Sequence, residues 1–141
     1  MDTQQLIDRY HKSLDEFSRG NSQPVKMLYS HGDDVFLANP FGLTAIGWSQ
    51  VSDALDFASS KFKDGEVKNF QLIAKYLNPE LAIVFEIEKW KAKVAGREEV
   101  SFFDLRATTA FRKEGSDWSL IYRHADPIAS FNADGPLRGD L

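Results

Sequence analysis

Residues 101–128 decide the fold: they read SFFDLRATTAFRK (101–113), EGSD (114–117) and WSLIYRHADPI (118–128). In the first run, one side of a period-two alternation is mainly apolar or small, with the members Phe103, Leu105, Ala107, Thr109 and Phe111. The residues between them are mostly polar, which predicts a β-strand with one dry face and one wetter face. The four residues after it predict a tight turn into a second strand.

The second strand carries the first candidate for a functional site. The same alternation places five of its residues on one face: Trp118, Leu120, Tyr122, His124 and Asp126. An apolar face therefore ends in a histidine and a carboxylate, and we expect one edge of a site here.

The composition predicts a single domain over residues 1–141. Of the 141 residues, 43% are hydrophobic and 13% are aromatic, which is enough for one proper core. A net charge of −4 without a long basic run argues against nucleic acid or a membrane surface as the partner. The absence of cysteine excludes disulfides, thiolate metal sites and cysteine nucleophiles. The N-terminus has no apolar signal-peptide core, so we expect a cytoplasmic protein.

Three helices are predicted in the first half of the chain. Asp2 or Thr3 can cap a helix whose apolar residues recur every three or four positions up to Phe17, and Gly20 ends it. A short helix is expected over residues 22–29, a strand over 35–39 and a third helix between residues 47 and 64.

The rest of the chain reads as extended strands. They are predicted near residues 66–77, 81–94, 98–113 and 118–124, with hairpin-length turns between them. The segment 130–141 has no periodicity and is expected to be a loose tail. Helices followed by meandering strands predict an α+β fold, with three N-terminal helices packed on a strongly curved antiparallel sheet. Such a sheet leaves a conical, largely apolar pocket suited to a small molecule.

Three segments carry a resemblance to a known family. They are Asn39-Pro40-Phe41-Gly42 with the following Gly47-Trp48, then residues 106–112, and the closing residues 118–126. Together with the order of elements, they make residues 6–128 resemble the nuclear transport factor 2-like superfamily, in its SnoaL-like and ketosteroid-isomerase-like branch. The resemblance implies a cone-shaped, cystatin-like fold and a homodimer formed through the sheet. The fold hosts enzymes, subunits and binding modules, so it does not by itself imply an activity.

The steroid isomerases of this family use two acids that the sequence lacks. Their base lies in an Asp-Pro-x-Gly turn, where this chain has Asn39, and their second, protonated acid corresponds to Thr109. Their tyrosine on the first helix corresponds to Tyr10, so the proton donor is kept. An amide cannot shuttle a proton between carbons, which argues against ketosteroid isomerase activity.

In SnoaL-like cyclases, the resemblance implies acid–base work by an aspartate or a histidine at the pocket. His124 and Asp126 are the candidates here, because imidazole titrates near neutral pH and a neighbouring carboxylate fixes one tautomer. The alternative is a structural histidine that bonds a neighbouring group. Tyr10 is likewise either a pocket donor or a core tyrosine with a satisfied hydroxyl.

Further residues are candidate ligand contacts: Asn39, Thr109, Tyr122, Trp90 and Glu86. Asn39 can instead form the turn before Pro40 by bonding its own backbone, and Trp90 can instead be a packing residue. The strand 81–94 leaves two choices for its inner face. The resemblance points the Glu86 face inward, whereas hydrophobicity points the Phe85 face inward and leaves Glu86 and Glu88 in solvent. We expect the Phe85 face to point inward, because burying a lone carboxylate is costly.

No metal and no cofactor is expected. The three histidines (His11, His31 and His124) lie on different predicted elements, and no phosphate-binding glycine loop is present. Two hypotheses remain. One is a cofactor-independent enzyme that acts on a small apolar carbonyl or polyketide-like molecule through His124, Asp126 and Tyr10. The other is a binding or dimerisation module, in which the cone holds an apolar ligand or the sheet meets a second copy.

Overall fold

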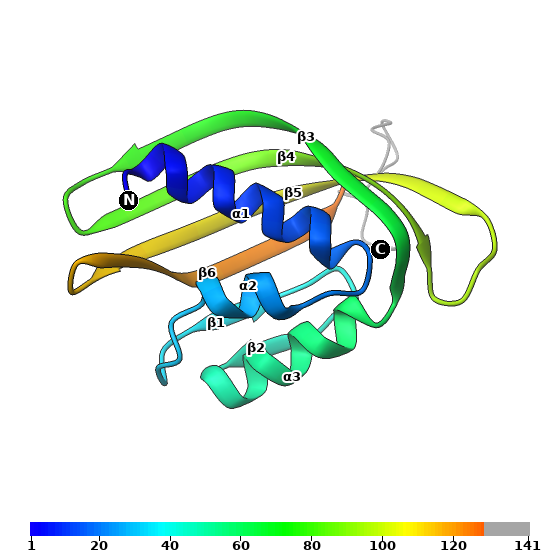
Figure 1. The fold of residues 1–141 in the computed structure, drawn as a ribbon, viewed down its shortest axis with the longest axis horizontal. Helices are drawn as coiled ribbons and strands as arrows, with labels where there is room; N and C mark the ends of the chain where they lie inside the picture. The colour runs from blue at the N-terminus through cyan, green and yellow to red at the C-terminus, as the bar shows by residue number, and fades with distance from the viewer. Residues whose placement is uncertain (129–141) are drawn as a thin grey trace, which may run out of the picture.

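Three helices lie on the concave side of one six-stranded sheet (Figure 1). The computed structural model describes residues 1–128, so the predicted tail over 130–141 lies outside the described residues. The helices are α1 (Thr3–Phe17), α2 (Gln23–Leu28) and α3 (Trp48–Ser59). The strands are β1 (Phe36–Ala38), β2 (Thr44–Ile46), β3 (Phe62–Leu77), β4 (Leu81–Val94), β5 (Val100–Glu114) and β6 (Asp117–Pro127). The α+β class with N-terminal helices is confirmed.

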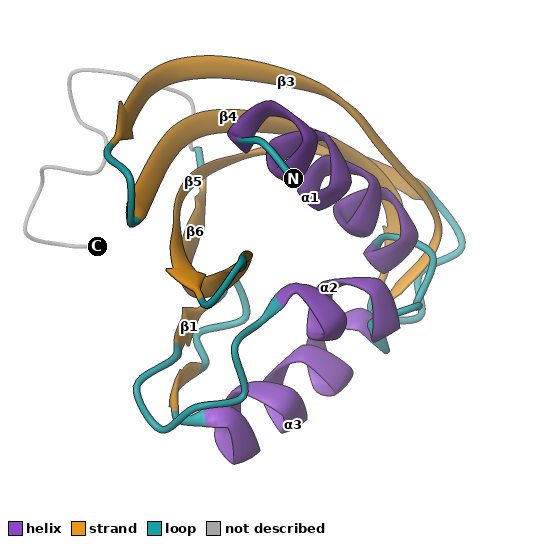
Figure 2. Ribbon diagram, turned by 60° about the vertical axis from the view of Figure 1, so that its left-hand side comes forward, coloured by secondary structure: helices purple, strands orange, loops and turns teal. Residues whose placement is uncertain are grey.

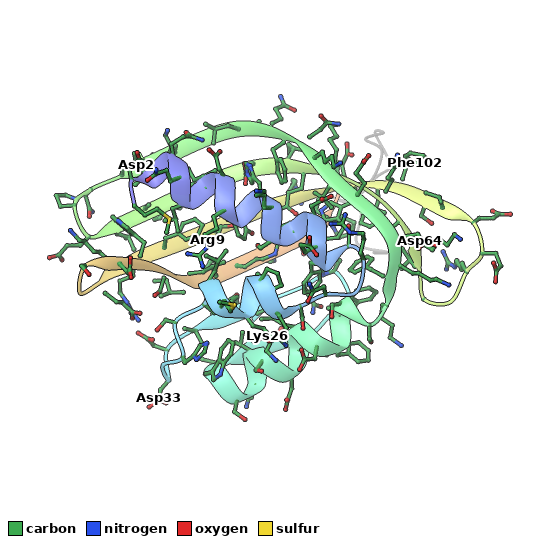
Figure 3. The ribbon with its side chains drawn as sticks, in the orientation of Figure 1. Asp2, Arg9, Lys26, Asp33, Asp64 and Phe102 are labelled. Carbon is green, nitrogen blue, oxygen red and sulfur yellow. The ribbon has the colours of Figure 1, made fainter. Side chains whose placement is uncertain are left out.

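Helix α1 forms where its capping signal and apolar spacing predict it. The Asp2 side chain accepts a hydrogen bond from the Gln5 backbone, and the Gln5 side chain accepts one from the Asp2 backbone. Figure 3 labels Asp2 beside the first turn of the helix. The buried stripe includes Leu6, Tyr10 and Leu14, which face the sheet core. Helix α1 therefore brings a tyrosine hydroxyl into the centre of the fold.

The sheet is antiparallel except at one pair of strands. Its strand order is β2-β1-β6-β5-β4-β3, and β1 runs parallel to β6. Strand β2, which the sequence reading did not include, pairs with β1 and completes this edge. The long strand β3 contains three register shifts against β4, and such bulges bend a strand. Figure 2 shows the resulting curvature, with the longer strands bending around α1.

A bulge in β6 changes which of its residues face the helices. Leu120 pairs with Phe111 and Tyr122 pairs with Ala110, so Ile121 is an extra residue in β6. Leu120 is fully buried before the bulge, and the buried positions after it are Arg123 and Ala125. The predicted shared face of Trp118, Leu120, Tyr122, His124 and Asp126 is therefore wrong, because the extra residue reverses the alternation halfway along the strand.

Strand β4 also faces the opposite way from the expectation based on hydrophobicity. Glu86 and Glu88 are 1% and 0% exposed on the concave side, in phase with Trp90. Ile83 and Phe85 lie on the convex side and are only partly buried. The expectation failed because partners from other elements compensate the buried carboxylates.

Candidate functional site

A buried ion pair lies at the centre of the concave face. Arg123 from β6 donates two hydrogen bonds to the Glu88 carboxylate of β4, at 2.7 Å from Nη1 and 2.9 Å from Nη2. The indole Nε1 of Trp90 donates a third hydrogen bond to Glu88, at 3.0 Å. Glu88 is fully buried and Arg123 is 7% exposed. The bidentate geometry and the third donor compensate the carboxylate for its loss of water.

Tyr10 joins this ion pair to strand β5. Its hydroxyl lies 3.0 Å from Thr109 Oγ1 and also accepts a hydrogen bond from Arg123 Nη1. Burial raises the pKa of Tyr10, and the positive charge of Arg123 offsets only part of that effect. The hydroxyl is thus protonated and already has two protein partners. Of the two readings offered for Tyr10, this geometry matches the core tyrosine with a satisfied hydroxyl.

The second buried carboxylate is paired separately. Glu86 lies with Oε1 2.8 Å and Oε2 3.0 Å from Nε2 of His11, which comes from α1. The His11 ring stacks on Phe70 of β3, with ring centroids 3.5 Å apart. His11 is partly buried, whereas Glu86 is 1% exposed. Both carboxylates of the concave face therefore have a nitrogen partner from another element.

A small cavity borders the ion pair on the concave face. Its lining comes from all three helices and from strands β1, β3, β4, β5 and β6, together with the turn after β1. Its volume is about 30 Å³, which is room for about two water molecules. The lining is apolar apart from Asn39, Trp90 and Arg123. The concave face thus holds a small, mainly apolar cavity, and the predicted small-molecule pocket stays a prediction.

Asn39 is held in a fixed orientation at the wall of this cavity. Its Oδ1 accepts hydrogen bonds from the backbone N–H groups of Phe41 at 3.0 Å and of Leu43 at 3.2 Å. These bonds form the turn that the sequence predicted at Pro40. Its Nδ2 is buried and has no hydrogen-bond partner within residues 1–128. Rotating the amide by 180° would break both of these hydrogen bonds, so they fix the position of Nδ2 as well as that of Oδ1.

His124 and Asp126 lie on the convex side of the sheet, away from the cavity. His124 Nε2 is 3.1 Å from Asp126 Oδ2, and their side chains are 46% and 49% exposed. Tyr122 shares this face, where its ring stacks on Phe36 at a centroid distance of 5.0 Å. The structure brings His124 and Asp126 together as a pair but does not bring them to Tyr10. An acid–base role for His124 and Asp126 stays a prediction, and it would have to operate on the convex side of the sheet.

The other predicted contacts divide between the cavity and the buried network. Asn39 and Trp90 line the cavity, whereas Thr109 and Glu86 bond to Tyr10 and His11. Within residues 1–128 no group of three or more histidine or carboxylate side chains is placed to hold a metal ion. In the same part of the chain, no helix has the length and apolar character needed to cross a membrane.

Sequence reasoning missed three functional-looking residues: Arg123, Glu88 and His11. The predicted alternation over residues 118–126 puts Arg123 on the face opposite His124, because it does not include the bulge at Ile121. His11 follows Tyr10 on α1 and was weighed only as a metal ligand. One feature of the sequence does indicate which face of β4 is buried. Lysines occupy alternate positions in its second half (Lys89, Lys91 and Lys93), which places the residues between them on the inner face.

Solved structures share this fold at low sequence identity. No protein-family model matches the chain, and a search of curated proteins found no match. A nuclear transport factor 2-like superfamily protein from Salmonella enterica serovar Typhimurium is 18% identical, with a TM-score of 0.76 over 94% of this chain and 95% of that chain. An uncharacterised protein with a cystatin-like fold from Caulobacter vibrioides is 18% identical, with a TM-score of 0.66 over 93% and 88%.

A third neighbour is described as a candidate dehydratase of the nuclear transport factor 2-like family, from Streptomyces avermitilis. It is 14% identical, with a TM-score of 0.66 over 90% of this chain and 94% of that chain. At these identities the likeness establishes the fold and no more. The chain therefore has the nuclear transport factor 2-like, cystatin-like fold that the sequence resemblance implied.

Proposed function

We propose that this protein binds a small, mainly apolar molecule in the cavity and holds one hydrogen-bond acceptor of that molecule, a carbonyl oxygen, with Nδ2 of Asn39. The observation that carries the proposal is the unpaired, buried Nδ2. A buried donor without an acceptor costs about 1–3 kcal/mol, and a ligand carbonyl would recover that cost. The apolar remainder of the lining suits a ligand whose other atoms are apolar.

The lining supports binding better than acid–base catalysis. No aspartate, glutamate or histidine within residues 1–128 lines the cavity. Arg123 lines it, but its charge is neutralised by Glu88. The hydroxyl of Tyr10 is enclosed by Thr109 and Arg123. A dehydratase or an isomerase needs a group that can take a proton from its substrate, and this cavity offers none.

A matched pair of ligands tests the proposal. Acetone carries a carbonyl, whereas 2-methylpropene has nearly the same shape with a methylene group in place of the oxygen. One net hydrogen bond is worth about 1 kcal/mol, so the protein should bind acetone about 3- to 10-fold more tightly. Calorimetry measures both affinities and the stoichiometry of binding.

Asn39→Asp is the matched variant. An aspartate keeps the oxygen that holds the turn but has no N–H to donate. We expect the variant to stay folded by circular dichroism and to lose the preference for the ketone. The proposal is overturned if wild type binds neither compound, or if Asn39→Asp keeps the full preference.

A second copy of this chain is the partner we propose for the convex face. A row of paired neighbours crosses all six strands on this side: Ile46, Phe36, Tyr122, Ala110, Ile83 and Tyr76. Ile46 is 62% exposed and Tyr76 is 66% exposed. Exposed apolar rows of this kind mark interaction surfaces.

The charges beside this row favour an identical face as the partner. Lys89 and Asp104 form an ion pair at 2.8 Å, and Arg106 lies opposite Asp126 in the sheet register. Because these charges are balanced within the face, two copies can meet without net repulsion. Sedimentation velocity should show a dimer that Ile83→Lys converts to a monomer. Met27→Lys, at an exposed site on α2, is the control that should leave the dimer intact. A wild-type monomer at the highest attainable concentration would refute this interface.

A further inference from the structure

A second hollow adjoins the cavity, and Phe41 lines both. Its volume is about 200 Å³, compared with about 30 Å³ for the inner cavity. Both are lined by the same four residues: Pro40, Phe41, Phe62 and Leu105. The outer hollow is otherwise apolar, with Arg97 and Ser101 as its polar lining residues. The two hollows are therefore neighbours that share one wall.

We infer that the inner cavity and the outer hollow form one site for an elongated apolar ketone, and that the ring of Phe41 is a displaceable partition within it. This inference rests on the proposed role of Asn39 as the donor to the ketone. The carbonyl end of the ligand lies at Asn39, and the apolar body extends past the position of Phe41 into the outer hollow. The outer end of the ligand can be polar, because it lies near Arg97 and Ser101.

The volumes require an elongated ligand. A cavity of about 30 Å³ accepts a carbonyl group and its nearest atoms, but it has no room for an aromatic ring while Phe41 is in place. The remaining atoms of any larger ligand must lie on the far side of Phe41. Within residues 1–128, the outer hollow offers that space next to the shared wall.

The turn that carries Phe41 has a fixed backbone and a movable ring. The backbone N–H of Phe41 is held by Asn39 Oδ1, and Gly42 takes a φ of +87°, which glycine adopts without strain. The Phe41 ring is only half-buried and packs edge-on against Phe57 with centroids 6.4 Å apart. It also packs at 5.6 Å from Phe62. Rotation about χ1 can thus move the ring while Asn39 keeps its orientation.

The test uses prodan, a naphthalene with a propionyl group at one end and a dimethylamino group at the other. Its fluorescence reports transfer from water to an apolar site, and stopped-flow mixing gives its association rate. If the open arrangement of Phe41 is populated at about 10% or less, removing the ring should raise affinity and association rate at least about 10-fold. Phe41→Ala is the test variant. Phe57→Ala is its control, since Phe57 contacts Phe41 but lines neither hollow.

Each outcome decides the inference. Faster and tighter prodan binding by Phe41→Ala, with Phe57→Ala unchanged, supports the partition. Equal rates and affinities for wild type and Phe41→Ala overturn it and leave the role of Asn39 intact. If acetone binds but prodan binds neither protein, the single elongated site is wrong while the proposed function stands. Phe41→Leu, which keeps an apolar side chain without the ring, replaces Phe41→Ala if circular dichroism shows that the alanine variant is unfolded.

Discussion

Replacing Arg123 by methionine tests whether the buried network determines stability. Methionine keeps the apolar length of the side chain but removes the guanidinium that donates two hydrogen bonds to Glu88 and one to Tyr10. In the variant, Trp90 is the only remaining donor to Glu88 among the described residues. The Glu88 carboxylate, which is fully buried, then has no positive charge beside it.

The expected cost is large relative to the stability of a domain of this size. Removing one partner of a buried ion pair typically costs about 3–5 kcal/mol, because the other charge is left without compensation. Domains are stable by only about 5–15 kcal/mol, so Arg123→Met should remove about a fifth or more of the free energy of unfolding. The melting temperature should fall by roughly 10–20 °C.

Two variants separate the buried charge from general disruption. Lys89→Met breaks the Lys89–Asp104 ion pair. Lys89 lies on the convex face of β4, the strand of Glu88, and the two side chains of the pair are 49% and 38% exposed. An exposed pair contributes at most about 1 kcal/mol, so this variant should be nearly as stable as wild type. The double variant Arg123→Met with Glu88→Met removes both charges and should recover much of the lost stability.

Urea unfolding followed by circular dichroism measures these proteins and the single variant Glu88→Met, which completes the double-mutant cycle. We expect a coupling energy of at least about 2 kcal/mol between Arg123 and Glu88. A loss below about 1 kcal/mol for Arg123→Met would show that the pair contributes no more than a surface ion pair. Additive losses in the double variant would show that the cost lies in packing and not in the unpaired carboxylate.

Tyr10 and Tyr29 should stay protonated in the folded protein above pH 10, because burial raises both pKa values. The unfolded chain releases these protons near pH 10, so the contribution of the two tyrosines to stability is complete below about pH 10. It is lost as the pH rises through their raised folded-state pKa values. Alkaline absorbance titration of folded and urea-unfolded protein checks this. Gly65→Ala should cost about 1–3 kcal/mol in urea unfolding, because an added Cβ would lie 2.3 Å from the carbonyl oxygen of Ser18; an unchanged midpoint would contradict the close approach. Deleting Ile121 should abolish the cooperative thermal transition, because a slip of one residue turns the buried side of the strand toward solvent; a native-like near-ultraviolet spectrum would refute this.

The sequence predicted the regular elements well, because their signals are local. The capping residues of α1, the glycine at φ +89° after it and the apolar stripes of α1 and α3 all lie within one or two turns of the residues they organise. Strand β4 begins and ends at the predicted residues, 81 and 94, because turn residues flank it. The parallel pairing of β1 with β6 was not predictable in this way, since it joins segments far apart in the chain.

The candidate site was predicted less well because its geometry depends on one inserted residue. Period-two counting assumes that the strand has no bulge, and Ile121 breaks that assumption between Leu120 and Tyr122. The counting therefore placed His124 on the apolar face of the strand, whereas the structure exposes His124 and buries Arg123 on the concave side. Asn39 was located correctly as a turn residue. Its unpaired Nδ2 could not be foreseen, because it depends on what surrounds the turn.

Strand β4 shows that the sequence contained a better indicator of the inner face than hydrophobicity. Lys89, Lys91 and Lys93 alternate with Trp90 and Ala92, and lysine is the residue that least tolerates full burial. Continuing this phase toward the start of the strand, with no bulge against β5, places both glutamates on the concave side. Hydrophobicity alone gave the opposite answer because it assumes that each buried carboxylate is unpaired and therefore has the full free-energy cost of desolvation. Here His11 of α1 pairs with Glu86 and Arg123 of β6 pairs with Glu88, and these partners offset most of the desolvation cost. In a strand of ambiguous faces, the phase of the lysines is thus the more reliable guide, because a buried glutamate can find an arginine or histidine partner while three alternate lysines would each need a buried acid.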